Sequence, residues 1–119
     1  MIPVQLNLRN FLSYRDPVEL ELGGIHLACI SGSNGAGKST ILDAITWVLF
    51  GKSRVKSDDD LVTRTEVAKG AMAEVGFVFE LEGAIYRIIR RKAVGKSVEL
   101  EFHARAANDA TDRWQVRTE

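Results

Sequence analysis

Residues 32–40 read GSNGAGKST, in which two glycines with four residues between them are followed by a lysine and a serine. This spacing matches the phosphate-binding loop called Walker A, G-x-x-x-x-G-K-[S/T]. Glycines let the backbone turn several N–H groups toward one anion, and a helix that starts beside the loop adds its positive dipole end. The stretch therefore predicts a nucleotide site. The alternative is a glycine turn that merely links two elements.

The side chains of the loop have chemistry that suits ATP with Mg²⁺. Lys38 can reach the β- and γ-phosphates, and the Ser39 hydroxyl can ligate Mg²⁺. Thr40 can hold the α-phosphate. Lys38 would then stabilise the charge of the transition state.

The segments on either side of the loop support this interpretation. Residues 25–31, IHLACIS, are apolar and predict a strand buried on both faces. From Lys38 to Phe50 apolar residues recur at helical spacing, and Gly51 stands where a helix commonly ends. Strand, glycine loop and helix in this order predict an α/β fold of the P-loop NTPase class.

The remaining segments predict antiparallel strands. Apolar and polar residues alternate over 2–8 and 18–22, with a turn at 14–17, and again over 75–81, 84–91 and 97–104, with a turn at Glu82–Gly83. Residues 52–70 are polar with little periodicity, which predicts an irregular segment with a short helix capped by one of its aspartates. The 119 residues are enough for one domain or a piece of one.

Composition limits the kinds of partner and the cellular compartment that suit this chain. Sixteen basic and sixteen acidic residues cancel, so contact with nucleic acid would need a local patch. No stretch approaches the roughly 18 apolar residues of a membrane span, and no signal peptide is recognisable. With one cysteine, Cys29, the chain is expected in a reducing cytoplasmic compartment without membrane contact.

Three other groups of residues invite a functional interpretation. His26 and His103 have no second ligand at metal spacing and are expected to be structural. A Walker B aspartate follows an apolar strand, and no such strand precedes Asp58, Asp59 and Asp60. A solvated loop with a helix cap is therefore the preferred interpretation of these aspartates. Five cations of one hairpin form a candidate DNA patch, with a solvated strand edge as the alternative: Arg87, Arg90, Arg91, Lys92 and Lys96.

Several motifs together resemble one family. LNLRNFLSYRD at the N-terminus, NGAGKSTILDAITWVLFG in the middle, DLVTR at 60–64 and the GAIYRIIRR strand are similar to the start of the SMC-like DNA-repair ATPases, the SbcC and Rad-fifty group. The resemblance implies that residues 1–119 are the N-terminal segment of an ABC-type ATPase head lobe, with antiparallel strands beside the strand–P-loop–helix unit.

The resemblance also implies a set of site residues. The phosphates and Mg²⁺ would be held by Asn34, Gly35, Ala36, Gly37, Lys38, Ser39 and Thr40, with Ser39 on the metal. Val62, Thr63 and Arg64 would lie near the base or ribose. Residues 10–13 would border the nucleotide, although Leu12 stands where some relatives carry a basic residue. Arg54 would approach phosphate or a facing head.

Parts of such a head are missing from the sequence. We find no LSGG-like signature, no Q-loop glutamine, no switch histidine and no apolar strand ending in Asp-Glu. We therefore expect this partial domain to bind ATP without effective hydrolysis, which the intact protein would perform. A P-loop kinase would need an arginine-rich lid, which is not visible.

The family implies several partners for the head. They are the C-terminal half of the same head, a second copy of the head in an ATP-dependent dimer, an SbcD-type metallo-phosphoesterase nuclease, and DNA. ATP-driven dimerisation would gate DNA access for the nuclease in double-strand-break repair, near the nucleoid. The alternatives are the head of another SMC or recombination-type ATPase, or a nucleotide-dependent interaction module without turnover.

Overall fold

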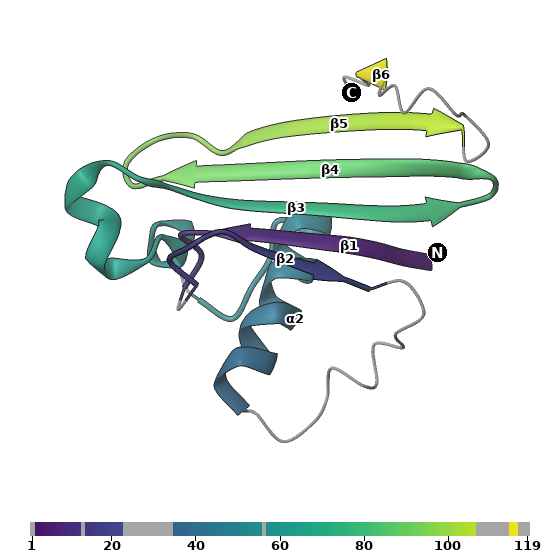
Figure 1. Cartoon of the computed structure of the whole chain (residues 1–119). Coiled ribbons are helices and arrows are strands. Elements are labelled where there is room, and N and C mark those ends of the chain that lie inside the picture. The colour runs from purple at the N-terminus through teal and green to yellow at the C-terminus, as the bar shows by residue number, and fades with distance from the viewer. Residues whose placement is uncertain (1, 13, 23–34, 56, 107–114, 117–119) are drawn as a thin grey trace.

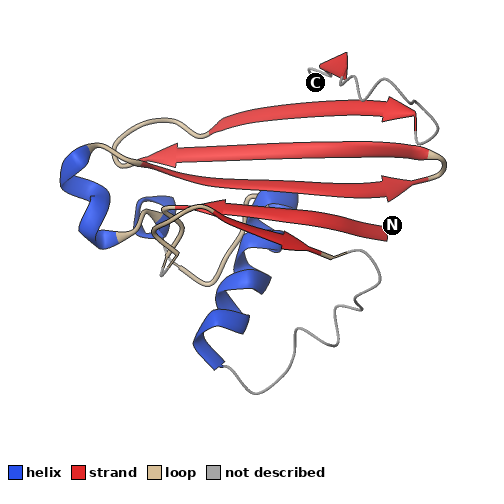
Figure 2. Cartoon of the chain, viewed as in Figure 1, coloured by secondary structure: helices blue, strands red, loops and turns tan. Residues whose placement is uncertain are grey.

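A computed structural model of the chain describes residues 2–12, 14–22, 35–55, 57–106 and 115–116, and for residues 35–39, 64, 115 and 116 it describes the backbone course. An antiparallel sheet dominates it, with helix α2 (Gly35–Phe50) against one face (Figures 1 and 2). The strand order is β2-β1-β3-β4-β5-β6. The strands are β1 (Ile2–Arg9), β2 (Val18–Glu21), β3 (Met72–Leu81), β4 (Ala84–Ala93), β5 (Glu99–Ala106) and β6 (Gln115–Val116).

Alternation along the strands separates an apolar face from a polar one. Leu6 of β1 lies opposite Leu20 of β2 and Phe77 of β3, and these side chains share the face that α2 covers. Gln5, by contrast, points to the other face and donates hydrogen bonds to two glutamates of β2, Glu19 at 2.6 Å and Glu21 at 2.8 Å. The period of two that the sequence predicts for these strands is therefore confirmed.

Helix α2 closes the hydrophobic core and contacts β3 and β4. Trp47 and Val48 are fully buried, and the Trp47 ring lies 5.7 Å from the ring of Phe11. The helix ends where the sequence predicts, because Gly51 adopts φ 72°, the left-handed conformation that terminates helices, and donates its N–H to Trp47 O. The outer side of the helix is less covered, with Leu42 and Phe50 exposed.

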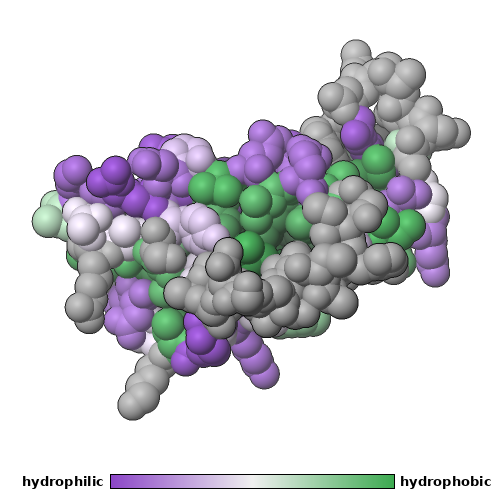
Figure 3. All heavy atoms as spheres, turned by 60° about the horizontal axis from the view of Figure 1, so that its bottom comes forward, coloured by the Kyte–Doolittle hydropathy of each residue, from purple (hydrophilic) through white to green (hydrophobic). Residues whose placement is uncertain are grey.

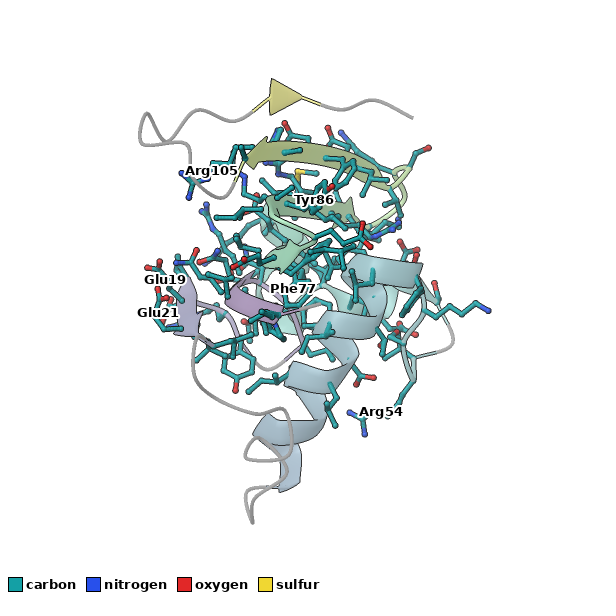
Figure 4. The ribbon with its side chains drawn as sticks, turned by 90° about the vertical axis from the view of Figure 1, so that its right-hand side faces the viewer. Glu19, Glu21, Arg54, Phe77, Tyr86 and Arg105 are labelled. Carbon is teal, nitrogen blue, oxygen red and sulfur yellow. The ribbon has the colours of Figure 1, made fainter. Side chains whose placement is uncertain are left out.

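The apolar face of the sheet extends beyond α2. A row of aromatic rings, each pair 5.5 Å apart, crosses β3, β4 and β5 through Phe77, Phe79, Tyr86 and Phe102. Figure 4 shows Phe77 and Tyr86 one above the other among the strands of the sheet. Apolar surface is also visible on this side in Figure 3.

Residues 52–70 differ in detail from the expectation. They contain two short 3₁₀-helices, η1 (Asp58–Leu61) and η2 (Arg64–Lys69). The predicted aspartate cap is wrong: Ser57 is the N-cap of η1, and its hydroxyl accepts the N–H of Asp59 at 3.2 Å. Serine and aspartate are equally good caps, so position decides between them. Strand β6 was not predicted, and the predicted strand at 25–31 lies outside the described residues.

Candidate nucleotide site

Helix α2 begins inside the glycine-rich loop. Its first turn starts at Gly35, so the backbone of residues 35–39 presents the helix N-terminus where the sequence predicts the phosphates. Thr40, one residue further, is buried. Asn34 and the strand before it lie outside the described residues. A helix start at this point of the motif suits an anion, because its first N–H groups have no partner within the helix.

A second constellation joins the β1–β2 connection to the residues after η1. The N–H of Leu12 donates to Leu61 O at 2.7 Å, and the N–H of Thr63 donates to Asn10 O at 3.0 Å. The Thr63 hydroxyl donates to Leu12 O at 2.8 Å. The structure therefore brings together two segments, around Asn10 and around Thr63, that the sequence predicts beside the nucleotide.

The backbone of this constellation is strained. Asn10 has φ 49° and Leu12 has φ 51°, the left-handed region that side chains with a Cβ disfavour. Leucine lacks the short polar side chain that lets asparagine adopt this conformation. Such residues persist only where their surroundings hold them, and they cluster at functional sites.

The three residues predicted to contact the base or ribose differ in where the structure places them. Val62 is 2% exposed, forms a bridge with Phe11 and contributes its side chain to the core. Thr63 is also buried, with its hydroxyl engaged by Leu12 O. Arg64 follows directly as the first residue of η2. Val62 and Thr63 therefore shape the local backbone, and their relation to a bound nucleotide stays a prediction.

Asp59 in the aspartate run forms a clamp with the β4–β5 hairpin. Its Oδ1 accepts from Lys92 Nζ at 2.7 Å and from the N–H of Gly95 at 3.1 Å. The hydrogen bond from Lys92, followed by the one from Gly95, lowers the pKa of the Asp59 carboxyl. Sequence reasoning missed this role, because nothing in the run DDD distinguishes Asp59 from its neighbours.

Arg54 is held by a buried carboxylate of α2. Its Nε donates to Asp43 Oδ2 at 2.7 Å, and its backbone N–H donates to Asp43 Oδ1 at 3.2 Å. Figure 4 shows Arg54 beside α2, on the opposite side of the molecule from Glu19 and Glu21. A hollow of about 420 Å³ lies here, lined by Leu42, Asp43, Thr46, Lys52, Ser53 and Arg54. The predicted approach of Arg54 to phosphate or a facing head stays a prediction.

The cations of the hairpin do not form one patch. Arg91 pairs with Glu74 at 2.6 Å and with Glu101 on the polar face of the sheet. Lys92, with its side chain 11% exposed, points to the other face and pairs with Asp59. Successive residues of a strand point to opposite faces, so the run of positive charge in the sequence is divided in space.

Arg87 and Arg90 also form contacts within the protein. Arg90 donates to Val48 O of α2 at 3.3 Å through Nη2 and lies 5.9 Å from the centre of the Trp47 ring. Arg87 donates through Nε to His103 Nδ1 at 3.0 Å. Burial, and next the charge of Arg87, lower the pKa of His103, so its imidazole is held neutral. His103 is thus structural, as expected, whereas His26 lies outside the described residues.

The described residues offer no metal-binding cluster and no membrane-spanning helix. Within them, no three His, Cys, Asp or Glu side chains are grouped closely enough to hold a metal ion. Among the helices that the structure describes, none is long and apolar enough to cross a membrane.

Comparison with known proteins identifies the family. A sequence model of the AAA domain family matches residues 5–117. The chain is 39% identical over 102 residues to the DNA double-strand break repair Rad50 ATPase of Thermoplasma volcanium and 40% over 105 residues to that of Thermoplasma acidophilum. It is 32% identical over 107 residues to the SbcC component of the SbcCD nuclease of Deinococcus radiodurans.

These matches cover most of this chain and little of the relatives. They include 85% of the chain for Thermoplasma volcanium and Deinococcus radiodurans and 87% for Thermoplasma acidophilum, but 11% of each relative. The chain thus spans about a tenth of the length of these curated relatives. The chain belongs to the AAA domain family, and its type is that of the Rad50 and SbcC ATPases.

Proposed function

We propose that the chain is the N-terminal, nucleotide-binding part of an ABC-type ATPase head in an SMC-like DNA-repair protein. The observation that carries the proposal is the start of α2 at Gly35, inside a complete G-x-x-x-x-G-K-S motif. Such a helix start provides N–H donors for phosphate, and family membership makes nucleotide binding the expected use of that geometry.

The donors available along residues 34–40 fit ATP with Mg²⁺. The backbone N–H groups of Gly35, Ala36 and Gly37, with Asn34, would surround the phosphates. Lys38 would neutralise charge between the β- and γ-phosphates, and Thr40 would hold the α-phosphate. Ser39 would supply a hydroxyl oxygen, the type of ligand that Mg²⁺ prefers. The metal would polarise the γ-phosphate when bound.

Contacts to base and ribose would come from the segment after η1. Arg64 follows Val62 and Thr63, whose backbone is held by the β1–β2 connection. A segment with buried side chains and many hydrogen bonds is rigid, and rigidity reduces the entropy lost on ligand binding. We propose that residues 62–64 are this recognition segment.

The roles of the whole protein follow by similarity and are proposals. The relatives are named for double-strand break repair and for a nuclease complex. We propose that ATP-driven dimerisation of the complete head, with its C-terminal half in place, controls access of DNA to a metallo-phosphoesterase nuclease. For these 119 residues by themselves we propose nucleotide binding without turnover.

The test of the site is Lys38→Ala. We expect loss of MgATP binding in isothermal titration with an unchanged circular dichroism spectrum, because the change removes the charge between the phosphates and no core side chain. The matched control is Lys52→Ala, which removes an exposed lysine beyond the same helix. Wild-type affinity for ATP in a folded Lys38→Ala variant would contradict the assignment.

A further inference from the structure

Lys92 is a buried cation with three acceptors. Its Nζ donates to Asp59 Oδ1 at 2.7 Å, to Ala93 O at 2.8 Å and to Lys96 O. The side chain is 11% exposed. A buried ammonium is tolerated only when paired and hydrogen-bonded, and all three donors of Lys92 are in use. Its position is therefore closely defined.

The same carboxylate oxygen receives a second donor from the hairpin. Asp59 Oδ1 accepts the N–H of Gly95 at 3.1 Å, while the N–H of Asp59 is capped by Ser57. Two donors from the β4–β5 hairpin thus meet on one residue of η1. We call this ion pair and its Gly95 bond the Lys92–Asp59 clamp.

In the sequence, the clamp residue Asp59 lies shortly before Leu61 and Thr63, which hold the strained backbone of Leu12. Asp59 accepts the N–H of Val62 at 3.3 Å through its main-chain oxygen, so the clamped residue also fixes the end of η1. Close by in the chain, Leu61 and Thr63 hold the left-handed backbone around Leu12. Figure 1 shows η1, the β1–β2 connection and the start of β3 gathered at one end of the sheet.

A continuous series of bonds therefore runs from the hairpin to the recognition segment. It passes from Lys92 to Asp59, through Val62, and across Thr63 to Asn10 O. The alternative to a functional role is a clamp that only stabilises the fold. Leu12, which Leu61 O and the Thr63 hydroxyl hold, has a disfavoured backbone, and such strain clusters at functional sites. This favours a functional role for the segment that the clamp adjoins.

We propose that Lys92 and Asp59 are positioning residues for the base and ribose of the bound nucleotide. The clamp sets the distance between the hairpin and η1, and thereby the place of residues 62–64 relative to the phosphate loop. The inference rests on the proposed function, in which residues 62–64 contact the base or ribose. It adds that an ion pair between β4 and η1 determines how strongly the nucleoside part contributes to binding.

The experiment compares two ligands that differ in the nucleoside. MgATP and magnesium tripolyphosphate are titrated calorimetrically into the wild-type chain, Lys92→Met and Asp59→Asn. We expect the clamp variants to lose about tenfold in affinity for ATP and to keep their affinity for tripolyphosphate, which lacks the nucleoside that residues 62–64 would contact. Lys96→Met is the matched control, because its side chain is exposed and only its main-chain oxygen accepts from Lys92.

The outcomes are distinguishable. Equal losses for both ligands, or none, would overturn the inference and leave the clamp a purely structural contact. If the wild-type chain bound neither ligand, the proposed function would fail, and the inference with it. If the Lys92→Met variant does not fold, the Asp59→Asn variant tests the inference, because this change keeps the shape of the side chain and removes its charge.

A second measurement needs no nucleotide. Amide hydrogen exchange of Leu12 and Thr63 is followed in the wild-type chain and in the same variants. We expect faster exchange at both amides in Lys92→Met and Asp59→Asn but not in Lys96→Met, because both amides donate across the contact between the β1–β2 connection and the residues at the end of η1 that the clamp holds. Unchanged protection in the clamp variants would show that the hairpin and the recognition segment are independent, and would overturn the inference.

Discussion

The left-handed backbone of Leu12 shows how a single residue is held against its preference, whereas Asn10 is a residue type that tolerates the same conformation. The left-handed conformation costs a residue such as Leu12 about 1–2 kcal/mol relative to an ordinary conformation. Hydrogen bonds from residues 61–63 offset this cost, and the Thr63 hydroxyl contributes one of them. The Thr63 side chain is thus a structural support of the proposed recognition segment.

Thr63→Val replaces the hydroxyl with a methyl group of similar size. We expect the free energy of unfolding to fall by about 1–3 kcal/mol, because Leu12 O loses its donor in a part-buried setting. Urea denaturation measures the change. Thr65→Val, at an exposed position two residues on, should alter stability by less than about 0.5 kcal/mol. Equal effects of the two substitutions would contradict this account.

Strand β4 is the element whose charged residues join the other elements. On the face toward α2, Arg90 donates to Val48 O of the helix and Lys92 binds Asp59 of η1. On the opposite face, Arg91 bridges Glu74 of β3 and Glu101 of β5. These contacts engage Arg90, Lys92 and Arg91 within the protein, so a DNA contact would draw on other cations or on side chains released from these pairs.

The pairing of β4 with β5 predicts a dependence of stability on pH. The neutral imidazole of His103 accepts from Arg87, and burial lowers its pKa below the ordinary value of about 6.5. Below that value the unfolded chain binds a proton that the folded chain does not, so stability falls as the pH decreases. The nearby Glu101 raises the pKa of His103 and Arg91 lowers it, which are smaller effects than burial.

Chemical denaturation between about pH 5 and pH 7.5 tests this dependence. We expect the stability of the wild-type chain to decrease toward the acidic end, and His103→Gln to show a flatter profile. The same slope in both proteins would place the titration elsewhere in the chain.

At the scale of the whole molecule, the surface of α2 is the notable feature. The helix is apolar on most sides, and Leu42 and Phe50 remain exposed beyond the core that it closes. A helix that is hydrophobic all round is usually buried in a larger protein. This agrees with a chain that spans 11% of its Rad50 and SbcC relatives, and with the proposed C-terminal half of the head as its neighbour.

The proposal predicts that ATP turnover requires that second half. The sequence contains no Walker B carboxylate and no signature motif, so the attacking water has no general base here. We expect negligible phosphate release from the chain alone and ATPase activity when the C-terminal half is supplied. Equal turnover by the chain alone and the reconstituted head, with contaminants removed, would contradict the proposal of a partial head.

Local patterns in the sequence were sufficient to predict most of the described fold, including the helix that starts within the motif proposed to bind phosphate. Alternation located β1 to β5, helical spacing and Gly51 located α2, and the motif at 32–40 predicts a phosphate site beside the start of that helix. These signals succeed because the side-chain periods of strands and helices, and the backbone freedom of glycine, are properties of a few consecutive residues. The two residues of β6 were too few to show a period.

Only the tertiary structure decided which residues act together. Asp59 and Lys92 are 33 residues apart, and Thr63 reaches Leu12 across 51. The same applies to the hairpin cations, whose neighbours in sequence point to opposite faces and bind different partners. Such contacts depend on strand register and on how the chain folds back, which no local pattern encodes. The sequence thus determined most of the elements and the motif of the proposed phosphate loop, and the packing of η1 against the β4–β5 hairpin determined the clamp that connects the hairpin to the proposed recognition segment.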